Sequence, residues 1–429
     1  MAERYDIVIV GAGPAGLAAA EAALAQGARV AWLDAQAAAG GQVWRKDVQY
    51  GWPRRAQRVI ASVSSHARLT WMPQTQVIAA EPNTLLLQNT REALRIRYGA
   101  LVLATGAREL LLPLPGWTLP GVTGAGGLQA LAKQGWPLAG RRVVIAGSGP
   151  LLLAAAATAK RHGARVLGIY EQASEATVHA FARKLWRWPG KAAQAALLRS
   201  QLAGIPHQYG SIVTRALGER ALERIEVDGP HGMQRIECDH LALGYGLVPN
   251  VELAQMLGCA MRLEGAHPCI EVNAAQGTSV PNIYAAGEAC GIGGRDCAWL
   301  EGRIAGLAAS GGAIDAALQR QQRHARRFAT LLRDHFKLDP YIYDLAEADT
   351  LICRCEDVPL RALAGYDDAR SAKLATRCGM GACQGRVCGT ALAELGLFAR
   401  SGLRPPLFPA RLATLGELAS SSDTEGSNS

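Results

Sequence analysis

The sequence predicts an α/β chain in which one Rossmann-like domain is inserted into another and a small cysteine-rich domain follows. Three observations lead to this prediction. One glycine-rich segment, YDIVIVGAGPAG, begins at residue 5, and a second, RRVVIAGSGPLLL, begins at residue 141. Five of the ten cysteines gather in residues 353–388. A chain of 429 residues is long enough for two or three domains with separate cores.

The first glycine-rich segment has the parts of a dinucleotide-binding unit. Its first glycine allows a tight turn, the second lets a pyrophosphate approach the backbone, and the third lets the following helix pack closely on the strand. The helix N-terminus then faces the phosphates. The next strand ends in Asp34, which can accept hydrogen bonds from ribose hydroxyls. The residues expected around the pyrophosphate are Gly11, Gly13, Pro14, Ala15 and Gly16.

Two later segments indicate that this dinucleotide is FAD. The buried strand YGALVLATGA, residues 98–107, ends where a chain must pass close to a bound nucleotide. The strand VPNIYAAGE, residues 280–288, ends in a glycine and a carboxylate placed to bind a ribityl hydroxyl. Residues 40–42, after the ribose-binding acid, are expected to wrap around the cofactor as well. The FAD contacts expected from these segments are Gly41, Gln42, Ala104, Thr105, Gly106, Gly287 and Glu288.

The second glycine-rich segment repeats the plan of the first with one departure. Gly147, Gly149 and Pro150 form the turn, and Glu171 ends the next strand as the ribose acid, which disfavours NADP because a 2′-phosphate would meet its charge. Leu152 stands where the third glycine belongs and should push the helix from the strand. Two interpretations stay open: a degenerate or repurposed site for a second nucleotide (NAD or ATP-like), and a working NADH site.

The distribution of the remaining cysteines excludes disulfide-reductase chemistry. That chemistry needs a cysteine pair beside the flavin, but the first cysteine in the chain is Cys238 and the inserted domain has no Cys-X-X-Cys. Buried, inert thiols are expected at the scattered positions. No base is identifiable in the sequence beside Cys290 and Cys297, the two thiols nearest the strand predicted over residues 280–288. The scattered positions are Cys259, Cys269, Cys290 and Cys297.

The C-terminal cysteines predict a metal centre. They occur as LICRCE, residues 351–356, and RCGMGACQGRVCG, residues 377–389, and thiolates favour Fe–S clusters or zinc over hard metals. Structural zinc usually takes two Cys-X₂₋₄-Cys pairs, whereas one arm here is Cys-X-Cys. A one-electron carrier also suits a flavin, so a [2Fe–2S] cluster is favoured. Spacing alone does not choose among Cys378, Cys383 and Cys388, because four residues separate each from the next.

Composition and charge patterning limit the other classes. The net charge of +9 comes mostly from scattered arginines. The densest basic segment, residues 320–337, is expected to be a solvated helix face between domains, with contact to an acidic partner as the alternative. No interleaving of basic and aromatic residues argues for nucleic acid, and no uninterrupted apolar run is long enough to span a membrane. Residues 404–411 predict an extended proline-rich arm, and residues 419–429 a disordered tail. The cysteine usage is typical of a reducing cytoplasm.

These segments together resemble the α-type flavoprotein subunits of heteromeric amine dehydrogenases, a family that includes the A subunit of opine oxidase, the B subunit of hydrogen cyanide synthase, and the α subunits of dye-linked proline and hydroxyproline dehydrogenases. The resemblance covers nearly the whole chain. Beyond the generic motifs it is carried by PGVTGAGGLQ (120–129), GYGLVPN (244–250), GIGG (291–294) and EGRIAG (301–306). The family usually has Asp where this chain has Glu288.

The resemblance implies a ligand set and a domain organisation. The cysteine pattern is similar to a bacterioferritin-associated-ferredoxin-like (BFD-like) [2Fe–2S] domain, whose ligands would be Cys353, Cys355, Cys383 and Cys388, with Cys378 a bystander. Val77 is a further expected FAD contact. The expected parts are residues 1–115 with 245–318 for the FAD-binding domain, 116–244 for the inserted NAD-like domain, 319–349 for a helical linker, 350–400 for the BFD-like domain, and 401–429 for the arm and tail.

The resemblance also implies a role and partners. A separate flavoprotein β subunit oxidises the amine, and the α-type subunit relays electrons through FAD and [2Fe–2S], often with a small ferredoxin-like [2Fe–2S] subunit. No catalytic residue for the amine is expected in this chain. The implied location is the cytoplasm, with peripheral association at the inner face of the membrane as an alternative. A self-contained NADH-dependent ferredoxin-type reductase and a scaffold subunit with vestigial sites are the other hypotheses.

Overall fold

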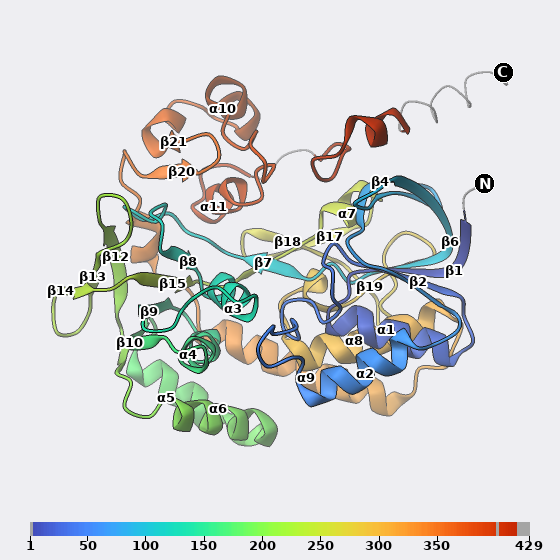
Figure 1. Ribbon diagram of the computed structural model, residues 1–429, viewed down its shortest axis with the longest axis horizontal. Coiled ribbons are helices and arrows are strands. Elements are labelled where there is room, and N and C mark those ends of the chain that lie inside the picture. Colours follow the sequence, from blue (N-terminus) through green and yellow to red (C-terminus); the bar gives the residue numbers. More distant parts are fainter. Residues whose placement is uncertain (1–2, 400–402, 418–429) are drawn as a thin grey trace.

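The computed structural model describes residues 3–399 and 403–417. Its first domain is built on a sheet of order β3-β2-β1-β6-β5-β4, with β19 beside β6 (Figure 1). Strands β1, β2, β3, β6 and β19 pair in parallel, and β4 and β5 form an antiparallel extension. The strands are β1 (Glu3–Val10), β2 (Val30–Leu33), β3 (Leu69–Met72), β4 (Gln76–Glu81), β5 (Thr84–Gln88), β6 (Ala93–Leu103) and β19 (Ile283–Ala285).

Helices and short strands cover this sheet. Glycine lets the two central helices cross closely, since a Cβ on Gly302 would lie 2.1 Å from the carbonyl oxygen of Ala15. Figure 1 shows these helices, α1 and α8, together below the sheet. The covering elements are α1 (Pro14–Ala25), α2 (Arg54–Ser64), α7 (Glu252–Met256), β17 (Met261–Glu264), β18 (His267–Ile270), the 3₁₀ turn η2 (Gly287–Cys290) and α8 (Arg295–Ala309).

The inserted domain has its own parallel sheet, of order β11-β10-β9-β15-β8, and an antiparallel sheet β12-β13-β14. An antiparallel pair, β7 with β16, carries the chain between the two domains. The elements are β7 (Ala107–Glu109), β8 (Val122–Gly124), α3 (Ala125–Lys133), β9 (Arg142–Gly147), α4 (Leu151–Arg161), β10 (Arg165–Glu171), α5 (Glu175–Lys184), η1 (Leu185–Arg187), α6 (Pro189–Gln201), β11 (His207–Tyr209), β12 (Ile212–Leu217), β13 (Arg224–Asp228), β14 (Gln234–Glu237), β15 (His240–Gly244) and β16 (Leu247–Pro249).

The basic segment expected to be a solvated helix face between domains is helical, and its exposed face carries Arg320, Arg323 and Arg327 while its other side packs on both domains. Helix α9 (Ala316–His335) contacts α8 of the first domain and α5 of the inserted domain. The ring of Phe328 lies 6.3 Å from that of Phe181, and Arg326 is ion-paired with a buried glutamate. A 3₁₀ turn, η3 (Pro340–Asp344), follows. Arg326 departs from this solvated face because its ion-pair partner lies on another helix.

The cysteine-rich domain is a small unit with its own core. It contains β20 (Leu351–Cys353), β21 (Val358–Pro359), η4 (Leu360–Leu363), α10 (Ala369–Thr376) and α11 (Cys388–Glu394). Ile352, Leu363 and Leu392 form its apolar centre together with three of the cysteines. In Figure 1 it lies above the inserted domain and near β7.

The proline-rich arm lies on the first domain. The Leu407 N–H donates to the Ile78 carbonyl over 2.8 Å, and the guanidinium of Arg411 donates to carbonyls of the turn between β5 and β6. The tail predicted to be disordered, residues 419–429, lies outside the described residues. No helix in the described part of the chain is both long and apolar enough to cross a membrane.

Candidate functional site

The first glycine loop is packed against the end of β6. Gly11 adopts φ +108°, and a Cβ there would lie 2.2 Å from the Ala104 carbonyl oxygen, so only glycine fits. Gly13 caps α1, with Pro14 in the first turn. Gly41 comes down over this loop, since a Cβ on it would lie 2.7 Å from the Cα of Gly13. The structure therefore brings together the predicted glycine loop, the residues after Asp34 and the end of the strand predicted over residues 98–107.

Asp34 anchors this loop through its side chain. Its Oδ2 accepts from the Ala12 N–H over 2.6 Å and its Oδ1 from the Gln36 N–H over 2.7 Å. Burial raises the pKa of this carboxyl, although the two backbone hydrogen bonds oppose the shift. A carboxylate oxygen has more than one lone pair, so Asp34 retains acceptor capacity for ribose hydroxyls.

A cation that the sequence did not single out lies beside Asp34. The Nη2 of Arg45 donates to Gln42 over 2.8 Å, while its Nε is buried without a hydrogen-bond partner among the described residues. Burial lowers the pKa of Arg45, and the charge of Asp34 opposes that shift. An unsatisfied guanidinium N–H at a glycine-lined cradle fits an anionic dinucleotide. The available signal was a basic residue three positions after Gln42.

Val77 lies in the core as part of β4, whereas residues 104–106 form a loop at the end of β6. Val77 is buried in the core near the start of β4, just after Thr75, whose N–H donates to the Asp34 carbonyl over 2.9 Å. Thr105 donates through Oγ1 to the Asn250 carbonyl over 2.6 Å, and Asn250 Nδ2 donates back to the Thr105 carbonyl over 3.0 Å. This exchange fixes the loop formed by residues 104–106, the flavin loop, at the end of β6.

Glu288 lies in the turn η2, not in a strand as predicted. Its carboxylate accepts from the N–H groups of Gly293 over 3.0 Å and Gly294 over 2.8 Å, at the start of α8. Burial raises the pKa of this carboxyl, and the two N–H donors counter the shift. The carboxylate of Glu288 is therefore bonded to its own loop.

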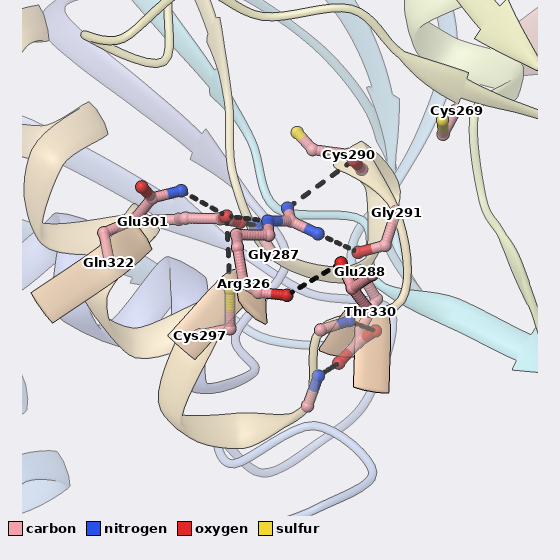
Figure 2. Close-up of polar contacts among 12 residues, drawn as sticks. Cys269, Gly287, Glu288, Cys290, Gly291, Cys297, Glu301, Gln322, Arg326 and Thr330 are labelled. Carbon is pink, nitrogen blue, oxygen red and sulfur yellow. Dashed lines mark hydrogen bonds and ion pairs between the residues drawn. The ribbon is translucent and has the colours of Figure 1, made fainter. Parts of the chain in front are cut away.

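A buried ion pair supports the same turn (Figure 2). Glu301 is fully buried; its Oε2 accepts from the Gly287 N–H over 3.0 Å and its Oε1 from Arg326 Nε over 2.5 Å. Arg326 Nη1 also donates to the Gly291 carbonyl over 2.9 Å. Figure 2 shows Arg326 lying between Glu301 and the loop of Cys290 and Gly291. Sequence reasoning missed this pair because its members come from α8 and α9.

One expectation about the thiols near the flavin strand is corrected. Cys297 has a carboxylate beside it, since its Sγ donates to Glu301 Oε1 over 3.3 Å. Burial nevertheless raises the pKa of both Cys297 and Cys290 far above the ordinary thiol value, and the charge of Glu301 adds to the shift. Both thiols therefore stay protonated and unreactive at neutral pH.

The second glycine loop is built like the first but uses its acid internally. Glu171 Oε2 accepts from the Gly149 N–H over 2.7 Å, and burial raises the pKa of Glu171 to about 7. Pro150 caps α4. The side chain of Leu152 is buried and lies 3.0 Å from where Gly244 would carry a Cβ, so the helix has packed around leucine on a glycine of the neighbouring strand.

A later segment of the chain covers this second loop. The Phe336 ring lies 3.4 Å from where a Cβ on Gly149 would stand, and it packs edge-on against Phe181 with ring centroids 5.0 Å apart. Ser148 Oγ donates to the Phe336 carbonyl over 3.2 Å, and Gln172 Nε2 to the Lys337 carbonyl over 2.8 Å. The space beside the glycine loop is thus occupied by residues 336–337.

The C-terminal cysteines converge on one site. The sulfurs of Cys353, Cys378 and Cys388 lie within 4.8 Å of one another, and all three residues are buried. The Cys383 thiol contacts those of Cys388 and Cys355, and Cys355 is exposed. Of the predicted ligands, Cys353 and Cys388 therefore meet at one point with Cys378, which was expected to be a bystander. The other two predicted ligands, Cys355 and Cys383, lie beside this group. Five thiols are present where a [2Fe–2S] cluster needs four, so the donor set fits such a cluster.

The fold and the glycine loops define a two-dinucleotide-binding-domain flavoprotein. Residues 5–309 match the family described as pyridine nucleotide-disulphide oxidoreductase, and the chain belongs to this family. Within it, the chain is 34% identical to the A subunit of opine oxidase from Rhizobium meliloti, over 96% of this chain and 99% of the relative. It is also 34% identical to hydrogen cyanide synthase subunit HcnB of Pseudomonas protegens, over 89% of each chain.

Solved structures with the same fold include two that cover much of the chain. L-proline dehydrogenase from P. horikoshii superimposes with a TM-score of 0.66 at 20% identity, over 97% of this chain and 80% of that chain. T. acidophilum thioredoxin reductase gives a TM-score of 0.56 at 21% identity, over 72% of this chain and 98% of that chain. The longer coverage by the first includes the cysteine-rich domain, which lies beyond the family match at residue 309.

Proposed function

We propose that the chain is the FAD and [2Fe–2S] electron-transfer subunit of a multi-subunit amine or imino-acid dehydrogenase. The observation that carries the proposal is the convergence of the C-terminal thiols on one site, in a chain whose remaining domains have a flavoprotein fold. FAD can accept a hydride and release electrons singly, and an iron–sulfur cluster accepts one electron at a time. The two groups therefore complement each other in one subunit.

The names of the relatives support the substrate class and the subunit role. Hydrogen cyanide synthase subunit HcnB and the A subunit of opine oxidase are parts of larger enzymes. We expect a CH–NH donor of the opine, proline, hydroxyproline or glycine type, oxidised by a partner flavoprotein subunit. A small ferredoxin-like subunit is a further expected partner, and the electrons would pass to a dye or quinone acceptor.

The residues of this chain would hold and orient the two groups. The first glycine loop, Asp34 and Arg45 form the cradle for the dinucleotide, and Glu301 with Arg326 keeps the Gly287 turn in place. The thiols of Cys353, Cys355, Cys383 and Cys388 would bind iron, with Cys378 beside them.

An NADH-dependent reductase is the alternative, and the second glycine loop disfavours it. Phe336 covers that loop, and the buried carboxylate of Glu171 accepts a hydrogen bond from the Gly149 N–H of the loop itself. The side chain of Leu152 fills the contact between helix and strand. Stopped-flow mixing of anaerobic protein with NADH separates the two functions. We expect no flavin bleaching on the time scale of turnover, and fast bleaching would establish the reductase instead.

Copurification tests the subunit role. Affinity purification of the natively expressed protein should bring down a second flavoprotein in stoichiometric amount, and the complex should reduce an artificial dye with an opine or imino acid. A chain that purifies alone and reduces the dye with these amines contradicts the proposal. A purified chain lacking both flavin and iron absorbance after anaerobic preparation would instead support the scaffold hypothesis.

A further inference from the structure

An arginine in the connection between the two domains contacts both the first domain and the cysteine loop, defined as residues 378–388. Arg108, in the short strand β7, donates from Nε to the Arg386 carbonyl over 3.2 Å and from Nη2 to Thr390 Oγ1 over 3.3 Å. Arg386 lies inside the cysteine loop, between Cys383 and Cys388. The guanidinium therefore contacts the backbone that joins two predicted cluster ligands.

The same guanidinium contacts the first domain on its other side. Its Nη1 donates to Asn250 Oδ1 over 2.7 Å and lies 3.0 Å from Glu252 Oε1. Asn250 in turn is held by the flavin loop, through the two hydrogen bonds with Thr105 and a third from its own N–H to the Gly106 carbonyl over 3.0 Å. Hydrogen bonds thus run without a break from Thr105 through Asn250 and Arg108 to the cysteine loop.

A second contact holds the cysteine loop from the direction of the arm. The side chain of Arg386 donates to the Leu407 carbonyl, and its guanidinium lies 4.2 Å from the centroid of the Phe408 ring. Leu407 is hydrogen-bonded to Ile78 of β4. The Arg386 carbonyl also accepts from Thr390 Oγ1 over 2.7 Å, so the peptide that Arg108 contacts is itself fixed.

Burial and charge make this contact specific for arginine. The side chains of Arg108 and Glu252 are only 17% and 9% exposed, so the ion pair is largely removed from water and the positive charge is compensated. Arginine offers a planar set of five donors, and here they serve four different partners. Lysine would keep the charge near Glu252 but could not span both Asn250 and the cysteine loop.

We infer that Arg108 is a positioning residue that locks the cysteine loop onto the flavin loop. The docking itself follows from the contacts alone. Its consequence for electron transfer rests on the proposed function: one electron leaves the reduced flavin, its proton passes to water, and one ferric ion of the cluster becomes ferrous. Arg108 would keep the distance for this transfer constant.

Hydrogen–deuterium exchange on the full-length protein tests the docking. Arg108→Gln should speed amide exchange in the segment 378–395 by at least about tenfold, because charge-assisted hydrogen bonds to a fixed backbone are lost. Arg361→Gln, on the exposed surface of the cysteine-rich domain, is the matched control and should leave the amide exchange of this segment unchanged. Exchange as slow in Arg108→Gln as in the wild type overturns the inference.

A second variant keeps the test valid where Arg108→Gln fails to fold. Thr390→Val retains the volume of the side chain and leaves Arg108 in place, but it removes the hydroxyl that contacts Arg108 and Arg386. It should speed the same exchange by about threefold or more. If Arg108→Gln does not fold, amide exchange in segment 378–395 that is as slow in Thr390→Val as in the wild type overturns the inference.

Flash photoreduction of the protein by a one-electron deazaflavin donor tests the consequence for electron transfer. The cluster should be reduced through the flavin about tenfold more slowly in Arg108→Gln than in the wild type or Arg361→Gln. Altered exchange with an unchanged rate supports the docking and overturns its role in electron transfer. Protein that contains flavin but no iron refutes the proposed function instead, while the exchange result still decides the docking.

Discussion

Removing one member of the Glu301–Arg326 pair should be among the most damaging single changes in the first domain. Glu301 is fully buried, and its carboxylate accepts hydrogen bonds from both Arg326 and the Gly287 N–H of the turn η2. Arg326→Met keeps much of the side-chain volume and removes the positive charge. Among the described residues, the buried carboxylate then has Gln322, Cys297 and a backbone N–H as its hydrogen-bond donors.

The expected cost follows from the burial of the charge. Breaking a buried ion pair by removing one partner typically lowers the free energy of unfolding by about 3–5 kcal/mol. Arg333 lies on the same helix and pairs with Glu264 with its side chain 48% exposed. Arg333→Met should therefore cost about 0–1 kcal/mol. The double variant Glu301→Gln/Arg326→Met removes both charges of the pair, so its cost should fall short of the sum of the two single costs by at least about 2 kcal/mol.

Urea unfolding followed by circular dichroism measures the free energies, and flavin fluorescence measures FAD affinity. Arg326→Met should weaken FAD binding as well as stability, because the Gly287 turn loses its support. Additive costs in the double-mutant cycle, or an Arg326→Met cost no larger than that of Arg333→Met, would refute this reasoning.

Two further predictions concern the cysteine site and the second glycine loop. Cys383→Ser or Cys388→Ser should abolish the visible absorbance of the cluster and Cys378→Ser should spare it; an essential Cys378 with a dispensable Cys388 would show that the ligand register is wrong. Burial raises the pKa of Glu171 from 4.5 to about 7, so folding favours its protonated form. That stabilisation is full below the unfolded value and is lost as the pH rises through the folded one, by about 3 kcal/mol. Glu171→Gln should flatten this slope in urea titrations from about pH 5 to about pH 8, the exposed Glu175→Gln should not, and a slope unchanged in Glu171→Gln contradicts the assignment.

Local spacing was enough to predict the parts of the fold that depend on neighbours in the sequence. The turn at Gly11, the helix after Gly13 and the acid at Asp34 all follow one strand–turn–helix unit, and the structure brings them together. The C-terminal cysteines could likewise be predicted to meet, because several thiols in a short segment are typical of a metal site. Which of the five would bind a metal depends on distances between the sulfurs, and the position of Cys378 beside Cys353 and Cys388 shows that spacing does not reveal it.

The remaining features depend on tertiary contacts between distant segments. Arg326 looked like one of several surface arginines on α9, and its partner Glu301 lies on another helix. Phe336 covers the second glycine loop although the two are far apart in the chain. Arg45 and Arg108 carried no motif, and only the fold places one beside Asp34 and the other beside the cysteine loop. The role of a charged side chain depends on whether it is buried and paired, and a sequence pattern does not report burial.

Anaerobic purification followed by cofactor analysis tests the central proposal most directly. Flavin, iron and acid-labile sulfide should be measured on the same sample, and the reduced protein should be examined by electron paramagnetic resonance. We expect one FAD per chain, iron and sulfide each at twice the flavin content, and the spectrum of a reduced [2Fe–2S] cluster. Zinc in place of iron, or a flavin-containing protein with a silent spectrum and no sulfide, would contradict the proposal.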